Sequence, residues 1–192
     1  MRQIPPVSQP ALQPNFVSEE DYLAGEASSD VRHEYLGGLV YAMAGETRTH
    51  NTICLNLIST LRQPLRGGPC RLYASDIRVN LNLRDDSYYY YPDLVVTCDS
   101  RDNYPRFVHH PKLILEVLSE STQRVDRREK FFAYTSLPSL EEYVLVTQAV
   151  PEVTMFRRSA SWKAETVIGG EANLRLDSVG LSLPLATVYE GL

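Results

Sequence analysis

The fold is decided by PKLILEVL at residues 111–118, taken together with PDLVVTC at residues 92–98. Each stretch is almost continuously apolar over the length of one strand, which predicts a strand buried on both faces in the middle of a sheet. Each also carries one carboxylate, Asp93 or Glu116. A buried carboxylate is costly unless it is paired or binds a metal, so Asp93 and Glu116 are the leading candidates for a functional site.

On the N-terminal side of these strands, the sequence predicts two helices, a hairpin and a strand. Ser18-Glu19-Glu20-Asp21 is a helix-start signal, and Gly37-Gly38 between two β-prone runs predicts a hairpin turn. Residues 47–66 are predicted to be a helix, because apolar residues recur at four-residue spacing. In residues 77–83 apolar residues alternate with Arg78 and two asparagines, which predicts a strand with one exposed face.

On the C-terminal side, residues 123–136 are predicted to form a helix with Phe132 on its apolar side. Strands are expected at residues 142–147, 153–157 and 162–168, and residues 181–189 are expected to form a short helix or strand. The order of these elements predicts an α/β (α+β) fold with a mixed central β-sheet flanked by helices.

Composition predicts one domain and excludes several classes of protein. The chain has 192 residues and a net charge of −5, so its surface is not uniformly basic. Residues 1–17 hold four of the twelve prolines and are expected to be an N-terminal arm, with one domain over 18–192. No segment is apolar enough for a membrane span or a signal peptide, and the three distant cysteines predict neither a disulfide nor zinc. We therefore expect a soluble, cytoplasmic protein.

The chemistry of the carboxylates predicts a metal site. Asp93 and Glu116, on neighbouring strands, would form an oxygen-rich site of the kind that Mg²⁺ or Mn²⁺ prefers. Asp126 and Lys130 share one face of the helix that follows the Glu116 strand. A lysine beside two carboxylates and a metal can hold a phosphate or orient a water molecule, an arrangement suited to phosphodiester hydrolysis.

Structural interpretations remain open for the same residues. Glu116 could instead form a buried ion pair with Lys130 or with an arginine, and Asp126 and Lys130 could form a surface pair. His50 could cap its helix or contact DNA or a metal. The run Tyr88–Tyr91 favours packing in a strand over stacking on bases.

These residues also carry a resemblance to a known family. The chain resembles the Uma-family restriction endonucleases of the PD-(D/E)XK nuclease superfamily over about residues 16 to 190. The matching motifs are Glu34-Tyr35-Leu36-Gly37-Gly38, Met43-Ala44-Gly45, His50, Ser75-Asp76-Ile77-Arg78-Val79, Pro92-Asp93, Glu116-Val117-Leu118-Ser119, Ser121-Thr122, Asp126, Lys130, Tyr134 and Glu142-Tyr143-Val144-Leu145-Val146.

The resemblance implies a restriction-endonuclease-like core with Asp93 and Glu116 as its two acids. The superfamily's lysine commonly lies two residues after the second acid, but Leu118 stands there in this chain. The resemblance implies that Lys130 takes this part, with Lys112 as a weaker substitute. It also implies that Glu34 completes the metal site. Thr147-Gln148 stands where many members carry Asp-Pro, which we interpret as a turn variant.

The residues and the resemblance together imply a Mg²⁺- or Mn²⁺-dependent endonuclease acting on DNA, with no membrane partner. Asp93, Glu116 and Lys130 are the expected catalytic residues, Glu34 an additional metal ligand, and Asp126 and His50 supporting residues. One alternative is a non-catalytic nucleic-acid-binding or assembly module, and another is a hydrolase of small phosphate esters. A homodimer would supply the two sites needed to cut both strands.

Overall fold

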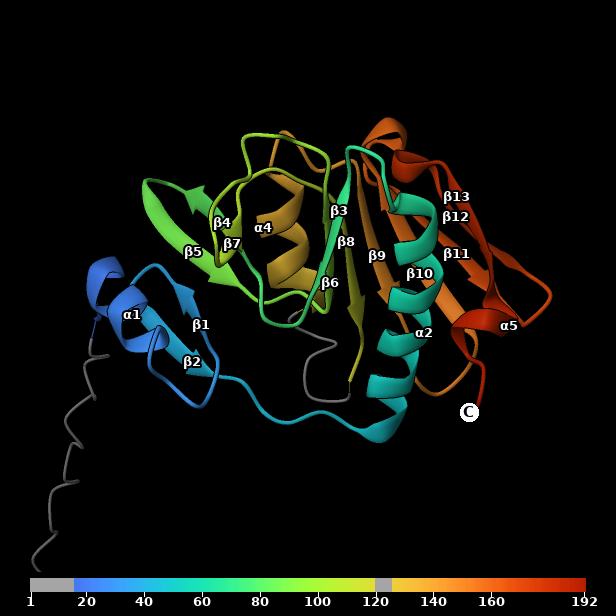
Figure 1. Ribbon diagram of the computed structural model, residues 1–192, viewed down its shortest axis with the longest axis horizontal. Helices are drawn as coiled ribbons and strands as arrows, with labels where there is room; N and C mark the ends of the chain where they lie inside the picture. Colours follow the sequence, from blue (N-terminus) through green and yellow to red (C-terminus); the bar gives the residue numbers. More distant parts are fainter. Residues whose placement is uncertain (1–15, 120–125) are drawn as a thin grey trace, which may run out of the picture.

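The central layer of the fold is a six-stranded mixed sheet, which runs through the middle of the molecule in Figure 1. The structure, a computed structural model, describes residues 16–119 and 126–192. The two middle strands, β8 and β9, pair in parallel and all other neighbours pair antiparallel. The predicted mixed central sheet is therefore confirmed. Its strands in spatial order are β11 (Ala164–Ile168), β10 (Glu152–Arg157), β9 (Glu142–Val146), β8 (Pro111–Val117), β6 (Leu94–Thr97) and β3 (Arg71–Ala74).

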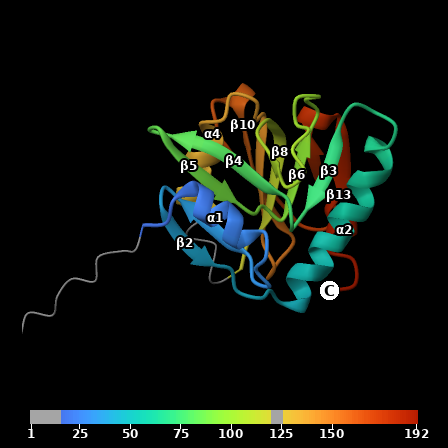
Figure 2. The same cartoon turned by 60° about the vertical axis from the view of Figure 1, so that its left-hand side comes forward.

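One face of the central sheet is covered by the helix α2 (Arg48–Leu65), which lies along the sheet in Figures 1 and 2. Thr47 caps it by accepting a hydrogen bond from the His50 amide at 3.0 Å. The predicted apolar face, with Ile53 and Leu57 fully buried, packs on the sheet. The same core takes in a small C-terminal unit of β12 (Asn173–Leu176), β13 (Leu181–Pro184) and α5 (Leu185–Val188).

The other face of the central sheet packs on a second sheet and on a short helical segment. That segment begins with the π-helical turn η1 (Asp126–Lys130) and continues as α4 (Phe131–Thr135). The second sheet contains, in spatial order, β2 (Leu39–Ala42), β1 (His33–Leu36), β5 (Asp86–Tyr90), β4 (Arg78–Leu83) and β7 (Phe107–Val108).

The position of Phe132 was predicted wrongly. It is 71% exposed, whereas Tyr134 is fully buried on the same helix. The wider π-helical turn that precedes α4 changes which side chains face the core, because its backbone hydrogen bonds join residues five apart, whereas those of an α-helix join residues four apart. This turn also directs Lys130, its last residue, into the interior.

The prediction that β4 has an exposed face is also wrong for most of the strand. Arg78 is only 3% exposed and Asn80 only 5%. The helix α1 (Glu19–Glu26), capped by Ser18 as predicted, contributes Tyr22 to a small aromatic core with Tyr35 and Tyr89. This aromatic core covers the side of the second sheet that the sequence pattern had assigned to solvent.

The cysteines correct a further prediction, because Cys70 and Cys98 form a disulfide. Strands β3 and β6 pair antiparallel with Arg71 opposite Thr97, so the residues just beyond that pair face each other. The 28-residue separation along the chain gave no sign of this neighbourhood. Cys54 is buried and has no disulfide partner.

Most of the predicted N-terminal arm, residues 1–17, lies outside the described residues; only its last two residues are described. The single domain over 18–192 therefore stays a prediction. Across residues 16–119 and 126–192, no helix is both long and apolar enough to cross a membrane.

The interior also contains a buried ion pair, whose removal we expect to destabilise the fold. The Arg157 Nε donates to Glu142 Oε1 at 2.7 Å, and the Glu142 carboxylate also accepts from the backbone of the turn η3 (Asp177–Val179). We predict that Glu142→Ala lowers the free energy of unfolding by about 3 kcal/mol, the low end for a broken buried pair, because Arg157 keeps other acidic partners.

Urea denaturation checks this prediction, with Glu171→Ala as the control because Glu171 is exposed. The control should change the free energy of unfolding by no more than about 0.5 kcal/mol. An equal effect of both substitutions would contradict a structural role for the buried pair.

Candidate active site

Asp93 and Glu116 lie side by side because their strands are neighbours. The antiparallel pairing of β6 and β8 places Leu94 opposite Leu115. Asp93, just before Leu94, therefore lies opposite Glu116, just after Leu115. The Asp93 amide donates to Glu116 Oε2 at 3.2 Å, and the Val117 amide donates to Asp93 Oδ2 at 2.7 Å. Each carboxylate is therefore fixed by the backbone that carries the other.

The Glu116 carboxylate is almost completely buried, at 3% exposure, and it is stabilised from both sides. Its Oε1 accepts from Lys130 Nζ and from the Tyr134 hydroxyl, both at 3.3 Å. Together with the Asp93 amide on Oε2, these donors offset much of the cost of burying a charge. These contacts hold the Glu116 carboxylate in one position beside Asp93.

Lys130 is the buried cation of the cluster. Its Nζ lies 3.0 Å from Glu34 Oε1 as well as 3.3 Å from Glu116, and 5.8 Å from the centre of the Tyr90 ring. Lys112, the other lysine considered, pairs with Glu141 instead and lies outside this cluster. Among these two lysines, only Lys130 is placed to act beside the carboxylates.

Glu34 reaches the cluster from β1. Its Oε1 accepts from the Tyr91 amide at 3.2 Å and from Lys130. Its side chain is only 14% exposed. Glu34, which was predicted to be an additional metal ligand, therefore also contacts Lys130 directly. The Asp126 side chain lies outside what the structure describes.

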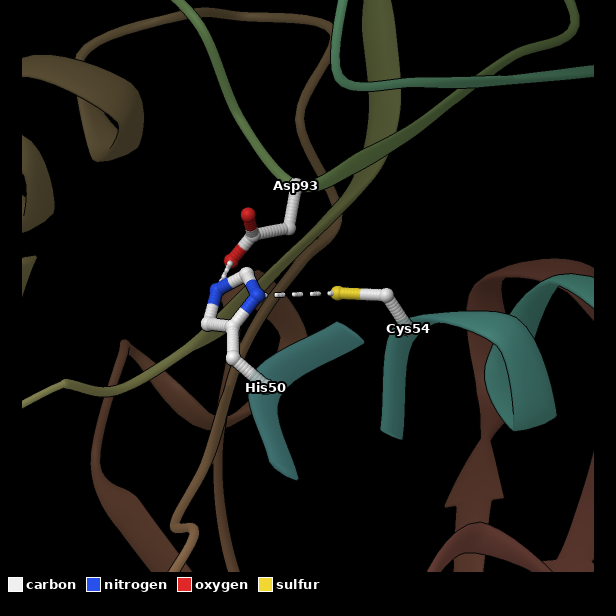
Figure 3. A group of neighbouring side chains, drawn as sticks. All are labelled: His50, Cys54 and Asp93. Carbon is white, nitrogen blue, oxygen red and sulfur yellow. Dashed lines mark hydrogen bonds and ion pairs between the residues drawn. The ribbon is translucent and has the colours of Figure 1, made fainter. Parts of the chain in front are cut away.

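His50 and Cys54 join the cluster from the first turns of α2, as Figure 3 shows. The His50 Nε2 lies 3.2 Å from Asp93 Oδ2, and its Nδ1 lies 3.6 Å from Cys54 Sγ. Burial raises the pKa of the Cys54 thiol, and the surrounding carboxylates raise it further. The Cys54 thiol therefore keeps its proton.

Cys54 was not predicted to belong to the site. The sequence feature that could have indicated it is its position four residues after His50, which places both side chains on the same face of the predicted helix. Gln148 was also underestimated, because it was interpreted only as a turn variant. It accepts from Thr47 Oγ1 at 2.7 Å and donates to the Leu118 carbonyl at 3.0 Å. It thereby ties the start of α2, and so His50, to the end of β8.

The donor set fits a divalent cation. Donor atoms of His50, Cys54 and Asp93 all lie within 4.8 Å of one another, and Glu116 lies directly beside Asp93. In Figure 3 one carboxylate oxygen of Asp93 faces His50 and the other points away. That second oxygen, Oδ1, makes no hydrogen bond with any residue in the described part of the chain. The carboxylate oxygens suit Mg²⁺ or Mn²⁺, and carboxylate oxygens together with an imidazole nitrogen suit ions such as Mn²⁺ or Zn²⁺.

The family of the chain follows from its sequence. Residues 19–186 match the Uma2 family, described as "Putative restriction endonuclease", and the chain belongs to this family. Two proteins of Synechocystis are similar to it. It is 34% identical to uncharacterized protein slr1290 over 181 residues, covering 92% of this chain and 93% of that protein. It is 29% identical to uncharacterized protein sll1609 over 164 residues, covering 83% and 92%.

The fold is similar to that in a crystal structure of a putative nuclease belonging to DUF820 from Anabaena variabilis. The TM-score is 0.74 at 15% sequence identity, with 90% of this chain and 97% of the other covered. The expected restriction-endonuclease-like fold agrees with this neighbour. Family membership and fold together support a nuclease-like function.

The contact between Lys130 and Glu34 can be measured by a double-mutant cycle. We predict that Lys130→Met costs about 3–5 kcal/mol of unfolding free energy, because it leaves buried carboxylates without their cation. Adding Glu34→Gln should recover about 1–3 kcal/mol of that loss.

The exposed pair of Lys112 and Glu141 provides the matched control for this cycle. Lys112→Met and Glu141→Gln should show a coupling energy of no more than about 1 kcal/mol. A Lys130–Glu34 coupling as small as this control value would mean that the two side chains do not interact as described.

Proposed function

We propose that this protein is a metal-dependent endonuclease that hydrolyses phosphodiester bonds in DNA. The observation that carries the proposal is the arrangement of Asp93, Glu116 and Lys130. Two carboxylates on neighbouring strands lie next to each other, and a buried ammonium group lies 3.3 Å from the second. The Uma2 family and the nuclease-like fold support this assignment.

Asp93 and Glu116 would hold a Mg²⁺ or Mn²⁺ ion, with His50 beside them. Such an ion supplies a more acidic bound water and offsets the charge that builds up on the phosphate. The backbone contacts between β6 and β8 keep the two carboxylates in place before any ligand arrives. Because the carboxylates are already in position, little free energy is needed to reorganise them when the ion and the phosphate bind, which favours catalysis.

Lys130 is proposed to stabilise the negative charge of the reacting phosphate or to position the attacking water. Tyr134 donates to the same Glu116 oxygen as Lys130, so it keeps this carboxylate oriented when the lysine turns toward a phosphate. Asp126 is proposed to orient Lys130 or a nearby backbone group. These roles need no lysine at position 118.

Glu34 is proposed to act on both the lysine and the metal. Its Oε1 holds the Lys130 ammonium group, while its Oε2 makes no hydrogen bond with any described residue. The second oxygen is therefore available as a ligand.

A homodimer is part of the proposal, with the edge strand β11 as the contact, because Ile168 on that strand is 67% exposed.

A cleavage assay tests the central proposal. Wild-type protein should cut plasmid and single-stranded DNA with Mg²⁺ or Mn²⁺, and a chelator should abolish cutting. Asp93→Asn, Glu116→Gln and Lys130→Ala should each reduce the rate by about 100-fold or more, because each removes a charge from the site. Lys112→Ala, which removes an equivalent lysine outside the cluster, should leave the rate unchanged.

Loss of cutting in the two carboxylate variants alone would place the catalytic cation elsewhere. No cutting by wild type on any substrate, together with no Mn²⁺ binding by calorimetry, would contradict the proposal. That result would favour the second candidate, a nucleic-acid-binding or assembly module. The second candidate rests on Leu118 at the usual lysine position and on the net charge of −5.

His50 gives a prediction about the choice of metal. Mg²⁺ prefers oxygen ligands, whereas Mn²⁺ accepts an imidazole nitrogen more readily. If His50 is a ligand, His50→Asn should reduce Mn²⁺-supported cleavage more than Mg²⁺-supported cleavage, by about 10-fold. Metal titrations of the cleavage rate measure this ratio, and an equal loss with both ions would assign His50 to the orientation of Asp93 alone.

A further inference from the structure

Arg78 in β4 is a buried arginine with unused hydrogen-bonding capacity. It is 3% exposed, and its Nε and Nη1 have no hydrogen-bond partner among the described residues. Its guanidinium carbon lies 5.3 to 5.8 Å from the ring centres of Tyr22, Tyr89 and Tyr91. The rings offset part of the cost of burying the charge, but they cannot replace the missing acceptors.

Arg78 lines a pocket of about 320 Å³ together with two more arginines. We call this the arginine pocket and define it by Arg32, Arg78 and Arg106. Arg106 is exposed, and its side chain forms no hydrogen bond or ion pair with any described residue. The arginine pocket therefore offers donors, from one buried and one exposed arginine, that have no acceptor within residues 16–119 and 126–192.

Two acidic residues also line the arginine pocket, but both already have partners. Glu26 accepts from the His33 amide at 2.9 Å and from the Tyr91 hydroxyl at 2.8 Å. Asp76 lies 3.4 Å from Arg32. Three arginines against two carboxylates leave one net positive charge, which matches the single negative charge of a phosphodiester.

The arginine pocket lies close to the candidate active site. Tyr91 lines it, and the Tyr91 amide contacts Glu34. Asp93 follows two residues later, at most about 7 Å along the backbone. Successive phosphates of one DNA strand rise by about 3.4 Å along the helix axis, and their separation through space is larger, comparable with the span from Tyr91 to Asp93. A strand whose phosphate is at Asp93 would therefore carry a neighbouring phosphate within reach of the arginine pocket.

We propose that the arginine pocket binds a backbone phosphate of the nucleic acid, close to the phosphate that is cut. Arginine presents paired N–H donors that match two oxygens of a phosphate. Because the unpaired atoms of Arg78 are covered, the anion reaches them as the side chains lining the pocket move apart. The proposal rests on the proposed function for the identity of the ligand, and on Arg78 for the site.

The first test observes Arg78 directly, in the absence of metal so that no DNA is cut. Protein labelled with ¹⁵N-arginine is titrated with inorganic phosphate and, separately, with a single-stranded DNA octamer. The assigned Arg78 Nε–H resonance should shift saturably with both. A shift with phosphate alone would overturn the assignment to nucleic acid, and no shift with either would overturn the site.

The second test measures DNA binding in chelator by fluorescence anisotropy at several salt concentrations. Arg106→Ala should weaken binding about 3- to 10-fold and reduce the slope of log affinity against log salt by about 1. The control is Arg66→Ala, an exposed arginine just beyond the opposite end of α2 from His50. Equal effects of both substitutions would contradict a specific site.

The two tests separate this inference from the proposed catalysis. Asp93→Asn should abolish cutting while it leaves the Arg106-dependent binding intact. Binding that depends on Arg106 in a wild-type protein that never cuts DNA would keep the phosphate site and reject the nuclease. Cutting that is unaffected by Arg106→Ala, with unchanged binding, would keep the nuclease and reject the phosphate site.

Discussion

The burial of one carboxylate, that of Glu116, is the constraint on which the rest of the site depends. The carboxylate lies on a middle strand of the central sheet, where an uncompensated charge would be strongly destabilising. Among the described residues, its compensation comes from two parts of the chain: the Asp93 amide on one side, and Lys130 and Tyr134 of the η1–α4 segment on the other. Folding therefore brings a second carboxylate and a cation to Glu116, and the same contacts that make its burial tolerable also assemble the candidate site.

This constraint explains why the lysine comes from a helix. Leu118 is 6% exposed and packs with the apolar residues between the two sheets, so a lysine at this position would place its charge in an apolar core. The π-helical turn instead directs Lys130 toward Glu116 from the adjoining segment. π-Helical turns are uncommon and occur frequently at functional sites, which agrees with this placement. The cation thus reaches the carboxylates without disturbing the core.

Much of the architecture could be predicted from the sequence, because apolar periodicity and turn residues are local signals. They gave the central strands, α2 with its buried face and the hairpin at Gly37-Gly38, whose residues have φ angles of 56° and 100°. Local signals could not show which other parts of the chain pack on each face of a strand or helix. Arg78 looked exposed because alternation identifies a polar face but not the tyrosines that pack on it. The Cys70–Cys98 disulfide and the bridging role of Gln148 depend likewise on long-range neighbours.

The central claim is that Asp93 and Glu116 together hold a divalent cation. Anomalous diffraction from crystals of the wild-type protein soaked in Mn²⁺ tests it most directly, because the method locates the ion without reference to activity. We predict one anomalous peak within bonding distance of oxygens from both carboxylates, and its loss in Glu116→Gln crystals. A peak at His50 and Cys54 that excludes Glu116, or no peak near Asp93 at any soaking concentration, would show that the two carboxylates do not share a cation.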